Sequence, residues 1–203
     1  MILLIDYGVG NLFSLKSSLC MIGEEVQVSR EPEEIRLADR LILPGVGAFE
    51  DAAAKLRASG LDQVIRKEAA SGKPLLGICL GLQLLFERSY EYGIHEGLGL
   101  LKGEIRPIAE KIPASFKIPQ MGWNALSIMK ESRILKDIRE GEYVYFVHSY
   151  SATGCDESLV AVTDYGAELT ACVEKDNIMG CQFHPEKSGD TGIRILKNFC
   201  EIK

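Results

Sequence analysis

A cysteine between two glycines is the residue of this chain best suited to covalent chemistry. Residues 74–86 read Pro-Leu-Leu-Gly-Ile-Cys-Leu-Gly-Leu-Gln-Leu-Leu-Phe, so that an apolar strand pattern ends at Cys79 and a helical pattern follows it. A sharp turn from a strand into a helix exposes a nucleophile, and it needs glycines wherever a Cβ would meet the backbone. A helix N-terminus also favours the thiolate form of a cysteine placed there. The pattern predicts that Cys79 is a nucleophile.

The alternative interpretation of Cys79 is a small buried hydrophobic residue, as most free cysteines are. The strand before it and the helix after it favour the catalytic interpretation. The remaining cysteines have no such context, and we expect them to be reduced thiols: Cys20, Cys155, Cys172, Cys181 and Cys200. No Cys-x-x-Cys pair occurs, and the 3 histidines show no zinc-ligand spacing, so we predict no metal.

A thiol nucleophile needs a base, and His184 is the best candidate. Residues 180–187 read Gly-Cys-Gln-Phe-His-Pro-Glu-Lys, in which an apolar strand ends at His184 and Glu186 follows two residues later. Because proline restricts the backbone between them, we expect Glu186 to reach the imidazole nitrogen that faces away from Cys79 and to hold the tautomer. By itself this pattern is weak, and a histidine that merely ends a strand is the alternative. The pairing with the cysteine turn favours the catalytic interpretation.

Acyl transfer also needs hydrogen-bond donors for the oxyanion that develops. Residues 41–49 read Leu-Ile-Leu-Pro-Gly-Val-Gly-Ala-Phe, a strand running into a turn where the amides of Gly45, Val46 and Gly47 could face a substrate carbonyl. The N–H of Leu80, directly after the nucleophile, is the expected second donor. This turn lacks the phosphate-binding fingerprints, so no nucleotide cofactor is predicted.

The first half of the chain alternates strands and helices that would position these residues. Four short apolar runs read as buried strands: Ile2–Ile5, Val26–Ser29, Leu41–Leu43 and Leu75–Ile78. Between the first two, residues 11–22 have helical spacing, with Asn11 as the N-cap and Gly23 as the stop. Continuously apolar strands joined by helices are typical of a parallel sheet that is covered on both faces.

The second half of the chain consists of closely spaced strands: Tyr143–Val147, Leu159–Thr163, Leu169–Val173 and Ile178–Phe183. Turn residues at 163–166 and 176–177 favour hairpins, and residues 191–200 favour a closing helix. We therefore expect an α/β fold: a three-layer sandwich with a mostly parallel central sheet and an antiparallel extension. Residues 1–203 should form a single domain.

Composition narrows the range of partners. With 46% hydrophobic and 26% charged residues, the chain has the composition of a folded protein. A net charge of -6 argues against nucleic-acid binding, which requires clustered cations. The first apolar run is broken by Asp6 and Gly8, too early for a signal peptide or a membrane span. We expect a cytoplasmic protein that binds neither nucleic acid nor membranes.

Taken together, these motifs resemble the class I, or triad, glutamine amidotransferases. The resemblance lies in Gly-Ile-Cys-Leu-Gly-Leu-Gln at residues 77–83 and His-Pro-Glu at residues 184–186. Five blocks in chain order are similar to the glutaminase subunits of imidazole glycerol phosphate synthases: residues 5–12, 44–49, 119–124, 145–150 and 182–189. The resemblance implies that Cys79, His184 and Glu186 form the catalytic triad.

The resemblance further implies that L-glutamine is the substrate and that no cofactor is needed. It assigns glutamine binding to Gln83 and the backbone of Ser149 and Tyr150, and the oxyanion strand to residues 45–47. Ammonia would pass to a separate (β/α)₈-barrel cyclase, which forms imidazole glycerol phosphate and an aminoimidazole carboxamide ribotide in histidine biosynthesis. Trp123 and Lys187 would face that partner.

One position departs from the family pattern, because Gln120 stands where the family usually has histidine. A contact with the cyclase through an imidazole would therefore be lost here. Other interpretations are a glutaminase subunit of pyridoxal phosphate or anthranilate synthase, a catalytically dead module on the same fold, and a flavodoxin-like nucleotide binder. The blocks at 122–124 and 187–189 argue against the two other synthases. The complete triad and the missing phosphate motifs argue against the last two interpretations.

Overall fold

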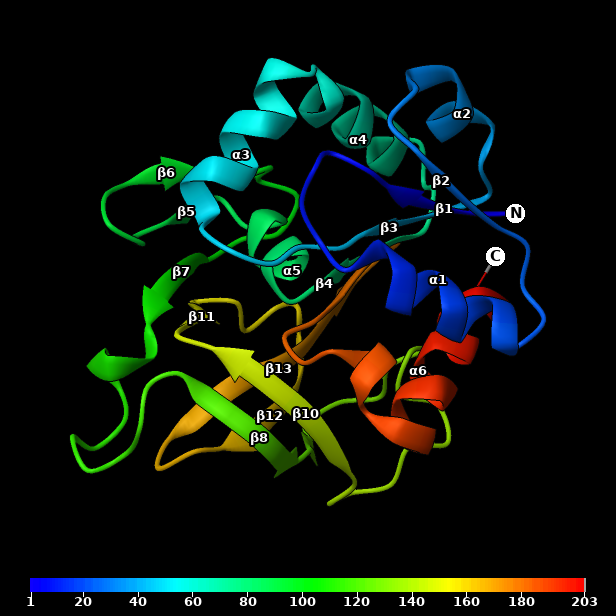
Figure 1. Cartoon of the computed structure of the whole chain (residues 1–203). Helices are drawn as coiled ribbons and strands as arrows, with labels where there is room; N and C mark the ends of the chain where they lie inside the picture. The colour runs from blue at the N-terminus through cyan, green and yellow to red at the C-terminus, as the bar shows by residue number, and fades with distance from the viewer. Residues whose placement is uncertain (203) are drawn as a thin grey trace.

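An eight-stranded mixed sheet is the scaffold of the computed structural model, which describes residues 1–202 (Figure 1). Across the sheet the strands are β2 (Val26–Ser29), β1 (Ile2–Ile5), β3 (Arg40–Leu43), β4 (Leu75–Ile78), β14 (Ile178–Cys181), β13 (Glu168–Lys175), β12 (Leu159–Asp164) and β9 (Ser127–Ile128). The first five are parallel and the last three pairings are antiparallel. This confirms the predicted α/β sheet with its antiparallel extension.

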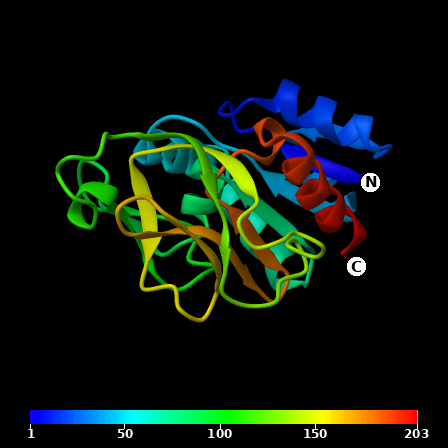
Figure 2. The same cartoon turned by 90° about the horizontal axis from the view of Figure 1, so that it is seen from below.

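Helices cover both faces of this sheet (Figures 1 and 2). Two of them, α1 (Leu12–Met21) and α6 (Gly189–Glu201), lie side by side on one face, close to both chain ends. The other face carries α2 (Pro32–Leu37), α3 (Phe49–Ala58) and α4 (Leu61–Ala70), and the short α5 (Leu80–Leu84) follows β4 directly. These are the three layers that the sequence predicts.

The parallel strands are apolar at every position because both of their faces are buried. Along β1, Leu3 and Ile5 pack in the cluster that includes α3 and α4, whereas Ile2 and Leu4 pack in the cluster that includes α1 and α6. Alternate residues of a strand point to opposite faces, so one short run supplies two hydrophobic cores. The strand ends that carry the functional residues are thereby held between two packed layers.

Two small sheets lie beside the central one. In the first, β8 (Gln120–Ala125) pairs antiparallel with β10 (Tyr143–His148). The second runs in the order β11 (Tyr150–Thr153), β7 (Glu104–Pro107), β5 (Arg88–Ser89) and β6 (His95–Glu96). Two 3₁₀ turns complete the elements, η1 (Ile108–Glu110) and η2 (Pro185–Lys187).

The strand predicted at residues 143–147 forms as β10, outside the predicted hairpins. This segment pairs with β8, which lies earlier in the chain, and it adds Val144 and Phe146 to the core under α6. Local patterning can predict a strand here but cannot tell which strand it pairs with. The two hairpins that join β12, β13 and β14 do form.

Local signals located the ends of α1 and α6 closely. The Asn11 side chain accepts a hydrogen bond from the Ser14 N–H at 3.3 Å, and Gly23 has φ +90°, as predicted for the N-cap and the stop of α1. The closing helix begins at Gly189, two residues before the predicted start. The single-domain prediction extends to residue 203, which lies outside the described residues, and it stays a prediction. Within residues 1–202, none of the helices combines the length and the hydropathy of a membrane span.

The close approach of Gly81 in α5 to the end of β3 allows a test of the fold. A Cβ on Gly81 would lie 1.8 Å from the Leu43 carbonyl oxygen, so Gly81→Ala should lower the free energy of unfolding by at least about 3 kcal/mol. Gly72 is the control, because it has φ +91° and open space around it, and alanine there should cost only about 1 kcal/mol. Urea unfolding measures both. Equal losses in the two variants would contradict the close approach.

Candidate active site

The turn at Cys79 has the strained geometry that exposes a nucleophile. Cys79 lies between β4 and α5 with φ 54° and ψ -111°, a conformation that residues with a Cβ rarely adopt. Its N–H donates to the Cys181 carbonyl at 2.8 Å, which anchors the turn to β14. A Cβ on Gly77 would lie 2.7 Å from the backbone of both Gly81 and Leu82. Both flanking glycines are therefore required by space, as the sequence predicts.

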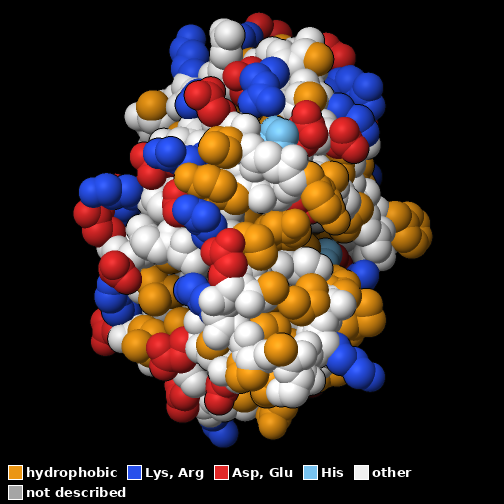
Figure 3. Space-filling model, turned by 90° about the vertical axis from the view of Figure 1, so that its left-hand side faces the viewer, with side chains coloured by type: hydrophobic (Ala, Val, Ile, Leu, Met, Phe, Trp, Pro, Cys, Tyr) orange, Lys and Arg blue, Asp and Glu red, His pale blue; other side chains and the backbone are white. Residues whose placement is uncertain are grey.

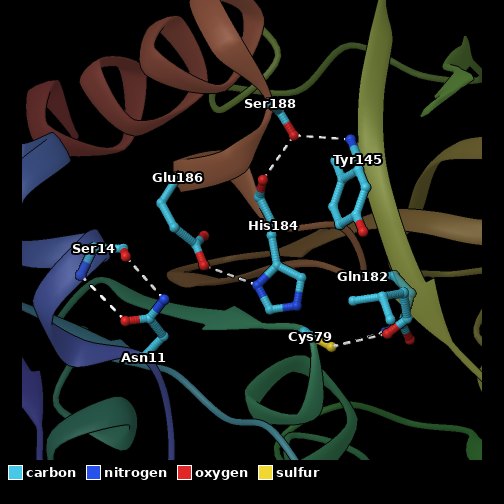
Figure 4. A network of polar contacts seen from close by, with 9 residues as sticks. Asn11, Ser14, Cys79, Tyr145, Gln182, His184, Glu186 and Ser188 are labelled. Atoms are coloured by element: carbon cyan, nitrogen blue, oxygen red, sulfur yellow. Dashed lines mark hydrogen bonds and ion pairs between the residues drawn. The ribbon is translucent and has the colours of Figure 1, made fainter. Parts of the chain in front are cut away.

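His184 and Glu186 form a buried pair beside this turn. The Glu186 Oε1 lies 2.8 Å from His184 Nδ1, and both side chains are only 3% exposed. A carboxylate can only accept, so Nδ1 carries the proton and Nε2 faces the cysteine side of the ring. Figure 4 shows the imidazole lying between the carboxylate and Cys79. The predicted contact between the two side chains is present.

The backbone around His184 is fixed by Ser188. The Ser188 hydroxyl donates to the His184 carbonyl at 2.7 Å and accepts the Tyr145 N–H at 2.9 Å (Figure 4). The Tyr145 carbonyl in turn accepts the His184 N–H at 2.9 Å. Strand β10 thus holds the turn that carries His184 and Glu186. Ser188 was not singled out from the sequence, because a serine after a helical turn has no distinctive pattern.

The charges at the site favour a protonated imidazole. Burial lowers the pKa of His184, but the neighbouring Cys79 sulfur and the Glu186 carboxylate outweigh it and raise the pKa to about 9. Among the described residues, His184 Nε2 has no hydrogen-bond partner. At neutral pH the imidazole is therefore protonated, and a positive charge beside a cysteine favours the nucleophilic thiolate.

The Cys79 sulfur is buried, with 7% of the residue exposed. The Gln182 Nε2 lies 3.7 Å from it, and the Val147 carbonyl oxygen lies 3.9 Å away on β10. Gln182 was not predicted as a site residue, although a signal existed. It precedes His184 by two residues, and alternate residues at a strand end face the same side.

A pocket of about 650 Å³ opens above the sulfur. It is lined by most of the residues predicted to bind substrate, namely Val46, Gly47, Leu80, Gln83, Ser149 and Tyr150, together with Cys79, His184 and Lys187. Gly45 lies just beneath, where a Cβ would be 2.8 Å from the Tyr7 hydroxyl. The structure thus gathers the predicted residues around one cavity, and their roles stay predictions.

The predicted oxyanion turn is anchored at both ends. The Tyr7 hydroxyl donates to the Pro44 carbonyl at 2.7 Å, and the Phe49 N–H donates to a Glu91 carboxylate oxygen at 2.6 Å. Between these anchors Val46 is 43% exposed, and Gly47 has φ +96°, which favours glycine. Glu91 also lines the pocket, and the sequence provided no signal for it because it lies in an irregular loop.

Gln120, which replaces the usual family histidine, does not reach the surface. It is fully buried, and the two ends of its amide lie 2.9 Å from His148 Nε2 and 3.0 Å from the side-chain amide of Asn124. Burial lowers the pKa of His148 to about 4, so this ring is neutral at pH 7. Its Nδ1 lies 2.8 Å from the Tyr150 carbonyl and must donate to it. The position serves internal packing of β8 against β10.

Apolar side chains are exposed near the pocket. Ile118 lines the pocket and is 46% exposed, and Met121 and Trp123 on β8 are 62% and 52% exposed. The Trp123 ring packs edge-on against Tyr145, with centroids 6.1 Å apart. Lys187 is exposed at the pocket rim. Figure 3 shows that hydrophobic side chains also gather across the middle of the face it displays.

Within residues 1–202, no group of three or more His, Cys, Asp or Glu side chains is arranged to hold a metal ion. The pocket instead combines a strained cysteine, a charged imidazole and a carboxylate. Those groups together can carry out nucleophilic acyl transfer.

Sequence comparison relates the chain to one enzyme family. The profile of the family described as glutamine amidotransferase class-I matches residues 3–202. The imidazole glycerol phosphate synthase subunit HisH of Wolinella succinogenes is 50% identical over 204 residues, which cover 100% of both chains. The protein of the same name from Aquifex aeolicus is 52% identical over 197 residues, covering 96% of this chain and 93% of that one.

Solved structures show the same fold at lower identity. A crystal structure described as a glutamine amidotransferase superposes with a TM-score of 0.77 at 20% identity, over 99% of this chain and 98% of that one. A chain of PurLQS from Thermotoga maritima gives a TM-score of 0.77 at 21% identity, over 98% and 96%. At such identities the likeness shows the fold alone.

The charge of His184 can be tested directly. The carboxylate is lost in Glu186→Gln. Burial still lowers the pKa of His184, and only the Cys79 sulfur still raises it. The pKa should therefore fall from about 9 toward the ordinary value of 6.5. An NMR titration of the imidazole protons measures it, with His184→Asn to assign the resonance. A pKa that stays near its original value would show that Glu186 does not stabilise the imidazolium.

Proposed function

The chain belongs to the class-I glutamine amidotransferase family, and from this membership we propose that it is the glutaminase subunit of an imidazole glycerol phosphate synthase. In this role it hydrolyses L-glutamine to glutamate and ammonia, and a cyclase subunit uses the ammonia in histidine biosynthesis. The observation that carries the proposal is the buried His184–Glu186 pair beside the strained Cys79. The relatives with about 50% identity over nearly their full length supply the name of the synthase.

The pocket offers complementary groups for an amino acid. Its lining includes the Glu91 carboxylate, which can pair with the α-ammonium group of glutamine. Gln83 uses its amide NH₂ for the Tyr150 carbonyl and Gln182, so its own oxygen is the atom left to accept from a ligand. Ser149 and Tyr150 also line the pocket. We assign these residues to holding the substrate while its side-chain amide reaches the sulfur.

Acylation begins when the Cys79 thiolate attacks the carboxamide carbon of glutamine. The oxygen becomes an oxyanion, and the N–H of Leu80 and an N–H from residues 45–47 are the donors we assign to it. His184, charged and held by Glu186, gives its proton to the departing nitrogen. Ammonia leaves, and glutamate stays attached to the sulfur as a thioester.

Deacylation uses the same groups in reverse. The neutral His184 removes a proton from water, which attacks the thioester carbonyl. The oxyanion forms in the same site, the C–S bond breaks, and glutamate leaves. The sulfur departs as a thiolate, and the imidazole keeps the proton, so the ion pair is restored. The Glu186 carboxylate stabilises the positive imidazole in both steps.

The partner-facing surface is assigned to the rim of the pocket. Exposed apolar patches near polar residues mark protein contacts, and Trp123 and Lys187 provide an aromatic anchor and a charge of this kind. We infer that a (β/α)₈-barrel cyclase docks here and receives the ammonia, with the complex in the cytoplasm. The single domain would thus present its active site to the partner.

The anchored oxyanion turn provides a means of control. Because Pro44 and Phe49 are held by hydrogen bonds, rotation of a peptide plane is confined to residues 45–48. Glycine tolerates both signs of φ, so a plane there can present either a carbonyl or an N–H to the substrate. A partner that binds the N–H orientation more tightly would shift the equilibrium by its differential affinity.

The nucleophile is tested with Cys79→Ser. Its hydroxyl is un-ionised near neutral pH, so glutamine hydrolysis should fall by more than about a hundredfold. Synthesis by the complex with added ammonium should stay close to that of the original protein, because this route bypasses the thiol. Glutamate release and cyclase product are measured side by side. Glutamine turnover within tenfold of the original would refute the role of Cys79.

Control by the partner is tested by glutamate release under three conditions: the chain alone, with the cyclase, and with the cyclase plus its nucleotide substrate. Losing one oxyanion donor costs a factor of roughly 10²–10³ in rate, so the chain alone should be slower by about that amount. The full rate should appear in the third condition. Equal rates in all three would show that the oxyanion turn is already in its active orientation.

A further inference from the structure

We propose that Gln182 is a positioning residue whose side-chain amide holds the Cys79 sulfur and favours its thiolate form. The residue is fully buried at the end of β14, and its Nε2 lies 3.7 Å from the sulfur (Figure 4). The inference deepens the proposed function, on which its consequences for glutamine turnover rest. The sulfur's own reactivity, however, can be measured without glutamine.

A backbone carbonyl fixes which end of the Gln182 amide faces the sulfur. The Tyr150 carbonyl can only accept, so the Gln83 terminal atom 3.1 Å from it must be the NH₂ group. The same NH₂ group lies 3.1 Å from the Gln182 amide, whose facing atom must therefore be the oxygen. The remaining end of Gln182 is its NH₂, and this end is directed at Cys79.

The Tyr150 carbonyl fixes the orientation of the Gln83 and Gln182 amides. The Tyr150 carbonyl also receives the Nδ1–H of His148 at 2.8 Å, so both of its lone pairs are used. A flip of either amide would bring two oxygens or two NH₂ groups together in a buried site, at the cost of unsatisfied polar groups. Hydrogen bonds in the packed interior therefore fix Gln182 so that its NH₂ group faces the sulfur.

The Val147 carbonyl and the Gln182 amide have opposite effects on the ionisation of the sulfur. A thiol can donate to the Val147 carbonyl 3.9 Å away, whereas a thiolate cannot, so that carbonyl favours the neutral form. The Gln182 N–H favours the charged form, because a hydrogen bond to an anion stabilises it. Burial also disfavours the thiolate, since the residue is 7% exposed. The His184 imidazolium also favours the thiolate, and Tyr7 is a further titratable group near the sulfur. Loss of Gln182 therefore weakens the stabilisation of the thiolate but leaves the imidazolium in place.

The test is the pH dependence of alkylation at Cys79 by iodoacetamide. Gln182→Leu and Gln182→Met remove the amide at similar volume, and the Cys79 peptide is quantified by mass spectrometry because Cys20 is also exposed to the reagent. A hydrogen bond to a charged group corresponds to about one to two pH units, so the midpoint of alkylation should move upward by that amount. Within the complex, kcat should fall about tenfold to a hundredfold while KM changes less than threefold.

Thr170→Val is the matched control. It also removes a buried hydrogen bond, from Thr170 Oγ1 to the Ala152 carbonyl at 2.9 Å, on the adjacent strand β13. Its unfolding midpoint should fall, yet its alkylation profile should match that of the original protein. If the Gln182 variants behaved like this control, with an unmoved profile, Gln182 would be structural only and the proposal would be overturned.

A measurement on the intact chain covers the case in which the Gln182 variants do not fold. The ¹⁵N resonance of the Gln182 side-chain amide should move as pH crosses the midpoint of Cys79 alkylation, and it should stay flat in Cys79→Ser. A flat resonance in the original protein would refute the contact. Neither readout requires glutamine hydrolysis, so a chain that fails as a glutaminase but shows both effects would refute only the proposed function.

Discussion

The rest of the site depends on how closely the end of β3 approaches the start of α5. The backbone after Cys79 passes the Leu43 carbonyl so tightly that position 81 has no space for a side chain. This contact holds the nucleophile in a strained conformation at a positive φ, and it places the predicted oxyanion turn directly beside the first N–H groups of α5. Strain of this kind persists only because both layers of the sandwich pack against the strands. The hydrophobic core therefore maintains the reactive turn.

Burial sets the electrostatic balance at the site. An imidazolium is costly inside a protein unless opposite charges lie nearby, and His184 has Glu186 on one side and the Cys79 sulfur on the other. The pKa of His184 is raised because these two neighbours outweigh the effect of burial. The neighbouring His148 is buried without such a partner, and its pKa is lowered instead. Two histidines close together in space thus take opposite charge states for a clear physical reason.

Hydrogen bonds tie the substrate pocket to the interior. The Tyr150 carbonyl accepts from both Gln83 and His148, and Gln83 continues to Gln182 at the sulfur. On the other side of the pocket, Glu91 holds the first N–H of α3 and with it the end of the oxyanion turn. Buried networks of this type are rigid when every member is satisfied. The proposed peptide rotation is correspondingly confined to the residues between the anchors of the turn.

Contiguous patterns in the sequence determined the local chemistry. The glycines around Cys79 require a sharp turn, and an acid two residues after His184 is within reach of the ring, because short spacings constrain the backbone directly. The strand and helix pattern likewise determined the α/β class. Only the tertiary structure decided that β14 lies beside β4, which brings distant segments to one edge of the sheet. It also placed Glu91, Ser188 and Gln182 at the site. Packing between segments far apart in the chain brings these residues together, so a local sequence pattern cannot predict their contacts.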